Sequence, residues 1–394
     1  MQLRNILSVL LIALTVGFLF VGALAAASAL PVQDLAQYWA AAHLVAKNPY
    51  SSVLVTQFER SAGIVASGAP IVMRNPPWAM VFVLPLRLLN YQSAFASWAL
   101  FSVVVLAGCA RASWKLNSAE ESPVPALLSL LFGPTVCLLM LGQIAILVLL
   151  GVTLFLCLTE RRRDWLAGAS LSLVSVKPHV ALIFLIAIAL WTVRYKRWAV
   201  LIGAGLTTIV SSIAVLLINP HIFAQYLAFA SQFVGETTPY PNVGGILFSL
   251  TGQHRLAFLP QAAGLAWLIF YWRKNRTTWD WKTNGMLVLL VSVACSYYSF
   301  PFDEIVILPA LIAAYAYGNR TVFVTGFIAT NIGYAMYIFK LAGNFGFGYM
   351  FLWWTASAWL LTFALSQKMR LRLSPTTVAN HSSLTEAGSH SAHI

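Results

Sequence analysis

The residues best suited to chemistry in this sequence are a few charged and polar side chains in short segments between long apolar runs. Asp34 lies in one of them, within LPVQDLAQYWAAAHLVAKNPY, and is one of only 11 acidic residues among 394. A carboxylate there can act as a general base that takes a proton from an attacking hydroxyl. It can also cap a helix that starts near Val32, because the residues up to Asp34 have the pattern of a helix entry. The local pattern alone favours the cap.

On that helix Asp34 would share a face with Tyr38, Ala41 and Val45, which follow at helical spacing. His43 falls nearly on the opposite face, so a catalytic pair of Asp34 with His43 within the helix is excluded by geometry. Tyr38 is the neighbour that we expect at the site, in contact with a sugar or an acceptor.

A second candidate segment is Arg74-Asn75-Pro76-Pro77-Trp78. Its prolines interrupt regular helix and place the flanking side chains at the membrane interface. Arg74 can hold a phosphate through two N–H groups, and Trp78 can stack on a sugar. The alternative is an interfacial belt of Trp and Arg without a catalytic role.

The third segment is Lys177-Pro178-His179, between two apolar runs. Proline is favoured at the first position of a helix, so the motif predicts a helix start with free backbone N–H groups. Such a start beside a lysine is a phosphate site, to which we assign Lys177 and His179 together with Arg74. The alternative for Lys177 is a side chain that reaches along the bilayer to the membrane surface.

Four further residues are weaker candidates for contacts to sugar or acceptor. Gln143 stands in a tight polar turn and can bind a hydroxyl or simply close the hairpin. His221 belongs to a long loop rich in aromatic and amide residues. Asp303 and Glu304 open an apolar run, where carboxylates are favourable at a helix N-terminus whatever their function. No metal-ligand spacing and no phosphate-binding glycine loop occurs, so we expect neither a metal nor another cofactor.

Composition decides the class of protein that must position these residues. Hydrophobic residues make up 60% of the chain and charged residues 9%, against about 25% charged residues in soluble domains. Apolar runs of helix-spanning length recur from end to end. The sequence therefore predicts an all-α polytopic membrane protein with about 12–13 transmembrane helices. The count depends on residues 77–89, which are either a short half-helix at the interface or a thirteenth span.

The distribution of Lys and Arg predicts the orientation. The net charge of +13 comes mostly from short basic clusters between apolar runs, as on the cytoplasmic side of membrane proteins, and not from the single basic face of a nucleic-acid binder. If residues 77–89 do not cross, alternation puts all the candidate residues on the outer side. Polar groups at membrane depth are costly and usually functional, which raises the weight of a catalytic role for Asp34.

The chain is expected to form one transmembrane domain over residues 1–372. Residues 28–76 would be a first outer loop with short helices at the membrane surface, and residues 219–255 a second long outer loop. The apolar run 6–27 is expected to remain as an uncleaved anchor, although a possible signal-peptidase site follows it. Residues 373–394 are rich in Ser, Thr and His and are expected to be a disordered cytoplasmic tail.

Six motifs, in this order, resemble those of glycosyltransferase family 87, the polyprenyl-phosphate-mannose-dependent α-1,2-mannosyltransferases of the GT-C superfamily. They are DLAQYWAAAHLVAKNPY, NPPWAMVFVLPL, GQIAILVLL, AGASLSLVSVKPHVALI, NPHIF and FDEIVILPAL. The chain departs from the family's pattern at two places. Asp303-Glu304 stand where one mycobacterial branch carries histidines, and Asn75 stands where an aromatic residue often precedes the two prolines.

The resemblance implies a GT-C-type fold in a bacterial cytoplasmic membrane, with an active site that faces the periplasm. It implies an inverting transfer of a hexose, expected to be mannose, from a polyprenyl-phosphate sugar to a hydroxyl of a glycan or glycolipid of the cell envelope. Asp34 would then be the catalytic base. The partners would be these substrates and membrane lipids, without nucleic acid.

Two alternatives remain from the residues. A transporter or flippase for a lipid-linked sugar would show inverted repeats and charges at mid-membrane, and neither is visible. An enzyme like the O-antigen polymerases and ligases would carry large arginine-rich outer loops, whereas the longest late loop holds only Arg255.

Overall fold

The computed structural model describes residues 34–64, 71–118, 120–233, 239–342 and 348–373, and contains no β-strand among them. The fold class predicted from composition, an all-α polytopic membrane protein, is confirmed. The expected anchor at 6–27 and all but the first residue of the expected tail at 373–394 lie outside the described residues, so both stay predictions.

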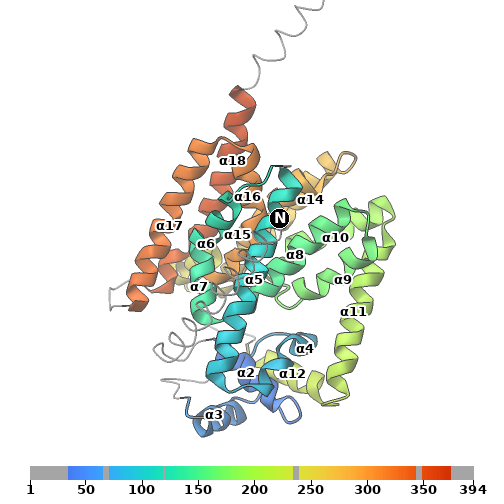
Figure 1. The fold of residues 1–394 in the computed structure, drawn as a ribbon, viewed down its shortest axis with the longest axis vertical. Helices are drawn as coiled ribbons and strands as arrows, with labels where there is room; N and C mark the ends of the chain where they lie inside the picture. The colour runs from blue at the N-terminus through green and yellow to red at the C-terminus, as the bar shows by residue number, and fades with distance from the viewer. Residues whose placement is uncertain (1–33, 65–70, 119, 234–238, 343–347, 374–394) are drawn as a thin grey trace, which may run out of the picture.

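Helices follow one another along nearly the whole described chain (Figure 1). The α-helices are α2 Leu35–Leu44, α3 Ser52–Ser61, α4 Met80–Val83, α5 Tyr91–Asn117, α6 Val124–Leu131, α7 Gly133–Leu141, α8 Ala145–Glu160, α9 Asp164–Val174, α10 Leu182–Tyr195, α11 Trp198–Leu216, α12 Ile222–Ala230, α13 Val243–Thr251, α14 Leu259–Asn275, α15 Met286–Ala294, α16 Leu308–Tyr317, α17 Arg320–Ala342 and α18 Thr355–Leu373. The short helices are η1 Pro77–Ala79, η2 Leu84–Leu88, η3 Ser231–Phe233, η4 His254–Phe258, η5 Trp281–Gly285, η6 Pro301–Ile307 and η7 Tyr349–Leu352.

Fewer helices are long enough to cross a membrane than the apolar runs suggest. Among the described residues, three helices pass by length and composition, α5, α11 and α17, and a fourth span is possible if α6 and α7 count as one. These two are bent by 61° at their junction, where Pro134 prevents a continuous helix. Several other apolar runs fold as helices of 10–17 residues, including α8, α10 and the continuous helix Trp281–Ala294 that η5 and α15 form together. Within the described ranges, the spans expected from the sequence therefore do not all appear as long helices, because prolines and short turns divide the apolar sequence.

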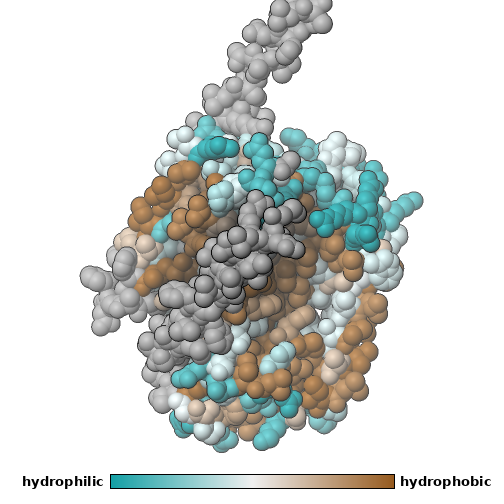
Figure 2. Space-filling view, in the orientation of Figure 1, coloured by the Kyte–Doolittle hydropathy of each residue, from teal (hydrophilic) through white to brown (hydrophobic). Residues whose placement is uncertain are grey.

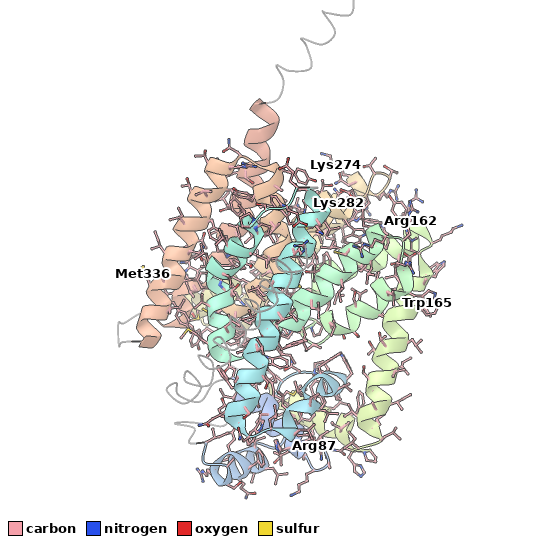
Figure 3. All side chains as sticks on the ribbon, viewed as in Figure 1. Arg87, Arg162, Trp165, Lys274, Lys282 and Met336 are labelled. Carbon is pink, nitrogen blue, oxygen red and sulfur yellow. The ribbon has the colours of Figure 1, made fainter. Side chains whose placement is uncertain are left out.

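Residues 77–89 fold as η1, α4 and η2, three short pieces beside α2 (Figure 1). Pro85 lies inside η2 and prevents a longer regular helix. The indole of Trp39 in α2 donates a hydrogen bond to the backbone oxygen of Leu89 at 2.9 Å, which fixes the end of the segment against α2. The segment is short and broken, as expected from its prolines, and its place at the membrane interface stays a prediction. Arg87 accordingly lies at the α2 end of the molecule, far from Arg162, Lys274 and Lys282 (Figure 3).

The flanks of the molecule are apolar and its two ends are polar (Figure 2). Helix α11 illustrates the flank, since Ile202, Leu206, Ile209 and Val210 are each more than half exposed. An apolar face of this extent is expected on a helix that contacts lipid. The opposite face of α11 packs against α9, where a Cβ on Gly203 would lie 2.3 Å from the backbone oxygen of Trp165.

Candidate active site

Asp34 precedes the first turn of α2, a helix whose residues are almost all buried. It occupies the N-cap position, but its side chain makes no capping hydrogen bond. Its carboxylate instead accepts a hydrogen bond from the side-chain amide of Gln143. The local pattern thus locates the helix start correctly, while the side chain serves a contact between segments distant in sequence. His43 points elsewhere and packs on Trp39 with ring centroids 4.5 Å apart, as the helical spacing predicts.

Gln143 reaches Asp34 because the turn between α7 and α8 packs tightly on the start of α2. Gly142 has φ +67°, which favours glycine, and a Cβ on it would lie 2.8 Å from Cβ of Leu35. The Gln143 side chain is buried, and its Oε1 accepts hydrogen bonds from the Tyr38 hydroxyl and the Lys177 ammonium, both at 3.0 Å. With Oε1 held by two donors, Nε2 faces Asp34.

Lys177 lies in the turn between α9 and α10 and is buried. Its ammonium donates to Oδ1 of Asp303 at 2.7 Å and lies 4.8 Å from the centroid of the Phe302 ring. Asp303, in η6, is completely buried, and its Oδ2 accepts the backbone N–H of Phe300 at 3.1 Å. A chain of polar contacts therefore runs from Asp34 through Gln143 and Lys177 to Asp303.

The helix start predicted at Pro178 is wrong. Residues 178–181 form a turn, and α10 begins at Leu182. Two of the first N–H groups of α10 are not free for a phosphate, because the backbone amides of Ile183 and Phe184 both donate to the hydroxyl of Ser292, at 3.1 and 3.4 Å. A phosphate at this place would depend on charged side chains.

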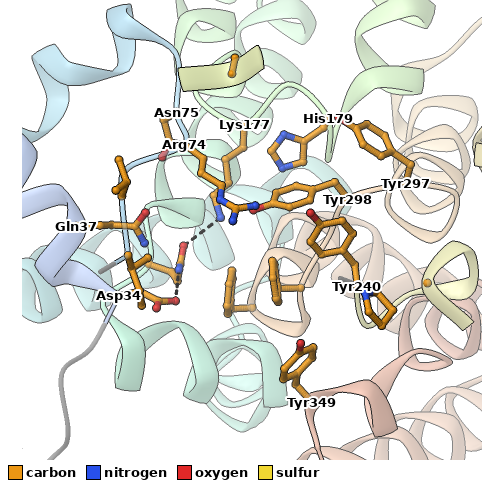
Figure 4. Close-up of a pocket in the computed structure, with 18 of the residues that line it drawn as sticks. Asp34, Gln37, Arg74, Asn75, Lys177, His179, Tyr240, Tyr297, Tyr298 and Tyr349 are labelled. Atoms are coloured by element: carbon orange, nitrogen blue, oxygen red, sulfur yellow. Dashed lines mark hydrogen bonds between the residues drawn. The ribbon is translucent and has the colours of Figure 1, made fainter. Parts of the chain in front are cut away.

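Arg74 stands on the segment before η1, which is tied to the Lys177 turn by two hydrogen bonds. The amide of Asn75 donates to the backbone oxygen of Val176 at 2.9 Å, and the indole of Trp78 donates to the hydroxyl of Ser175 at 3.0 Å. These contacts place the Arg74 guanidinium beside Lys177 at the centre of a cavity (Figure 4).

The cavity has a volume of about 870 Å³. Six of the residues predicted for the site line it, and further aromatic and amide side chains complete its wall. The predicted residues are Asp34, Tyr38, Arg74, Gln143, Lys177 and His179. A volume of this size is ample for a sugar together with part of a second substrate.

Four predicted residues are not among those that line the cavity. Trp78 is held by Ser175, and Asp303 lies behind Lys177 as its ion partner. His221 is exposed at the start of α12, where its backbone N–H donates to Oδ1 of Asn219 at 3.0 Å. Direct contact of these side chains with a sugar is therefore not what the geometry suggests.

Glu304, the fourth of them, points into the helical core. Its carboxylate accepts hydrogen bonds from Tyr334 at 2.7 Å, Thr355 at 2.6 Å and the Trp359 indole at 2.9 Å. These donors come from α17 and α18, so Glu304 joins the last two helices to η6. Its contacts indicate a structural role, because all of them are internal.

The sequence reasoning missed Gln37 and a group of tyrosines. Gln37 lies one turn along α2 from Asp34, faces the cavity, and makes no hydrogen bond within the described part of the chain. Tyr240, Tyr298 and Tyr349 line the other side (Figure 4). The proline-flanked Tyr240 gave a weak signal, whereas Gln37 gave none, because a glutamine in a helix has no distinctive pattern.

Burial raises the pKa of Asp34 above its ordinary value, and the Gln143 hydrogen bond and the charge of Lys177 oppose this shift. Burial, with a smaller effect of Lys177, lowers the pKa of His179 to about 3. The imidazole is therefore neutral at physiological pH and offers no charge to a phosphate. It packs edge-on against Tyr298, with centroids 4.7 Å apart. Within the described ranges, no three His, Cys, Asp or Glu side chains are grouped to hold a metal ion.

Comparison with protein families gives a match of residues 74–293 to glycosyltransferase family 87. The matched range includes Arg74, Gln143 and Lys177 and ends before Asp303. Asp34 precedes it and joins the matched residues only through the fold. No curated protein and no solved structure matches the chain.

Proposed function

Since the chain belongs to glycosyltransferase family 87, we propose that this membrane glycosyltransferase moves a hexose, mannose in the first instance, from a polyprenyl phosphate to a hydroxyl of a glycan or glycolipid. The observation that carries the proposal is the cavity in which the Asp34 carboxylate lies across from the cationic side chains of Arg74 and Lys177 (Figure 4). The carboxylate of Asp34 can remove a proton, and the cationic side chains of Arg74 and Lys177 can stabilise a departing anion.

In the proposed step the acceptor oxygen attacks the anomeric carbon and gives its proton to Asp34. The bond between that carbon and the phosphate oxygen breaks, and its electron pair leaves with the polyprenyl phosphate. Attack from the face opposite the phosphate inverts the anomeric centre. Burial raises the pKa of Asp34, which makes its carboxylate a stronger base than an exposed aspartate.

Positive charge near the leaving oxygen lowers the barrier in a site from which water is partly excluded. Arg74 and Lys177 supply it in this proposal. Lys177 donates one hydrogen bond to Gln143 and another to Asp303, so one of its three N–H groups remains for a phosphate oxygen. Arg74 presents a planar group that can bind two phosphate oxygens at once.

The cavity wall supports a sugar as the transferred group. Aromatic rings favour stacking on the apolar faces of sugars, and the amide of Gln37 can exchange hydrogen bonds with hydroxyls. The family match favours this activity over a transporter. We propose that the site faces the outside of a bacterial cytoplasmic membrane, because the more basic end of the molecule is the opposite one (Figure 3).

The test is transfer by the purified full chain from radiolabelled polyprenyl-phosphate-mannose to the glycolipids of a membrane extract. Asp34→Asn keeps the size of the side chain but cannot take the proton, so we expect a loss of about 10²- to 10⁴-fold in rate. The matched control is Asp280→Asn, which lies near Lys282 at the opposite end and retains an oxygen for its cap. It should keep full activity. An Asp34→Asn protein that is as active as this control would refute the assignment of the base.

A further inference from the structure

We infer that Gln143 is a positioning residue that holds the Asp34 carboxylate ionised and directed into the cavity, instead of a ligand of sugar or acceptor. The inference rests on the proposed role of Asp34 as the base. It starts from the burial of Gln143, of which only 3% is exposed, and from its three side-chain hydrogen bonds to Tyr38, Lys177 and Asp34.

The hydrogen-bonding capacity of the Gln143 amide is nearly used up inside the protein. Oε1 accepts from Tyr38 and Lys177, and Nε2 donates to Asp34, so only one N–H remains. A sugar hydroxyl that bound Gln143 would have to displace one of these buried contacts. The backbone oxygen of Gln143 also accepts a hydrogen bond from the Trp98 indole at 3.4 Å, which holds the turn in place.

The orientation of the amide decides its effect on Asp34. If the group were rotated by half a turn, its oxygen would face the carboxylate and its NH₂ would face the Lys177 ammonium, which has no acceptor. The Lys177 ammonium and the Asp34 carboxylate therefore fix the arrangement that presents an N–H to Asp34, and the Tyr38 hydroxyl donates to the same Oε1. A donor fixed in this way stabilises the charged form of a carboxylate that burial would otherwise drive toward protonation.

Gln143 also lies between two opposite charges that do not form an ion pair. The nearest carboxylate of Lys177 is that of Asp303, at 2.7 Å, while Gln143 connects Lys177 to Asp34. A direct ion pair would hold the base against Lys177 and away from an acceptor. The amide accepts a hydrogen bond from Lys177 and donates one to Asp34, so it transmits polarisation by the ammonium to the carboxylate. The other carboxylate oxygen of Asp34 is left for the proton transfer.

Several other titratable groups face Asp34, and they must be considered in any pH dependence. They include Tyr38 of α2 itself, Arg74 of the segment before η1, and Lys177 and His179 of the α9–α10 turn. The others are Tyr298 of the α15–η6 connection, Asp303 of η6, Tyr337 of α17 and Tyr349 of η7. His179 is neutral throughout the working range, since burial lowers its pKa to about 3. Asp34 is the group whose protonation blocks the proposed proton transfer directly.

The experiment measures the pH dependence of transfer from polyprenyl-phosphate-mannose for two glutamine variants. Gln143→Met preserves length and removes the amide, so Asp34 loses a donor and its pKa rises. The acidic limb of the rate profile should move to higher pH by about one unit. At alkaline pH, where Asp34 is ionised in both proteins, the rate should return to within about threefold of wild type, a fold-change of about 0.7 kcal/mol.

Gln37→Met is the matched contrast, because Gln37 lies on α2 beside the cavity and makes no hydrogen bond to any residue that the structure describes. It should raise the KM for donor or acceptor and leave the acidic limb where it is. The two variants are thus expected to differ: Gln143→Met changes the pH profile, and Gln37→Met changes the affinity for a substrate.

Tyr38→Phe provides a second variant in case Gln143→Met folds poorly, as judged by size-exclusion chromatography. It removes one donor to Oε1 and should shift the limb in the same direction by a smaller amount. A Gln143→Met protein that is slower at every pH, with the acidic limb of its rate profile unmoved, has lost only structure. One in which the KM alone is raised has lost a substrate contact. Either result overturns the inference. Failure of the base assignment is distinct, because Asp34→Asn would then remain active.

Discussion

At the scale of single residues, the site depends on buried charges that are tolerated only because each has a partner. Lys177 and Asp303 are the central pair, with side chains 8% and 0% exposed and 2.7 Å between Nζ and Oδ1. Removing one member of such a pair leaves the other charge without compensation, which costs more than the pair itself contributes.

We therefore expect Asp303→Asn to lower the free energy of unfolding by about 3–5 kcal/mol. It should also reduce transfer activity, because Lys177 would no longer be held in place. The measurement is the midpoint of thermal unfolding of the purified protein in detergent, followed by tryptophan fluorescence.

The control for this change is Glu121→Gln on the exposed pair with Arg111, whose side chains are 65% and 63% exposed. Solvent screens such a pair, so its loss should leave the midpoint nearly unchanged. Equal stability of Asp303→Asn and wild type would show that the Lys177–Asp303 contact does not hold the site together.

At the scale of elements, the site is assembled by the ends of helices and not by their middles. The start of α2, the turn after α7, the turn after α9 and the 3₁₀ helix η6 each bring one member of the network. Prolines and glycines create these ends inside apolar sequence. The turns can lie close together only if the helices that carry them pack closely. Helices α9 and α11 show how glycine allows such close packing.

Two glycines of α11 test this packing. Gly203→Ala would place a Cβ 2.3 Å from the backbone oxygen of Trp165 in α9, and backbone cannot move aside as a flexible side chain can. We expect a loss of about 1–3 kcal/mol in the free energy of unfolding.

Gly205→Ala lies two residues further on α11, where nothing comes within 4 Å of the added carbon. Alanine restricts the unfolded chain more than glycine does, so this variant should be up to about 1 kcal/mol more stable than wild type. Unfolding midpoints of the two variants, measured side by side, decide the matter. A Gly203→Ala protein as stable as Gly205→Ala would contradict the close approach of α9 and α11.

At the scale of the whole molecule, charge is distributed unequally between the two polar ends. Arg162, Lys274 and Lys282 lie at the end opposite α2, together with the turns that follow α8 and α10 (Figure 3). Basic residues are retained on the cytoplasmic side of membranes, so the cavity beside α2 should open to the outside.

Accessibility to a membrane-impermeant maleimide can test this orientation in intact cells. In a background without the four native cysteines, Ser52→Cys on exposed α3 should be labelled from outside. Lys274→Cys should be labelled only after the membrane is permeabilised. The reverse pattern would place the cavity in the cytoplasm and exclude a periplasmic site.

The sequence by itself determined the class of the protein and most of the charged residues around the cavity. Its composition left no soluble alternative, because so few polar residues cannot cover a globule. Because charged residues are rare in this chain, Asp34, Arg74 and Lys177 were identified as candidates. A charged group near the membrane is costly and is usually functional. The spacing along α2 likewise excluded His43 as a partner of Asp34.

Only the tertiary structure decided what each polar residue contacts. Gln143 precedes Lys177 by 34 positions and follows Asp34 by 109, so no local pattern could reveal that it bridges them. Asp303 and Glu304 are adjacent in sequence, yet one pairs with Lys177 and the other binds three donors from α17 and α18. Two of the N–H groups at the start of α10, those of Ile183 and Phe184, are taken by Ser292, which lies 109 residues beyond Ile183. The physical reason is that a buried polar group must find a partner, and packing between distant segments determines which partner is within reach.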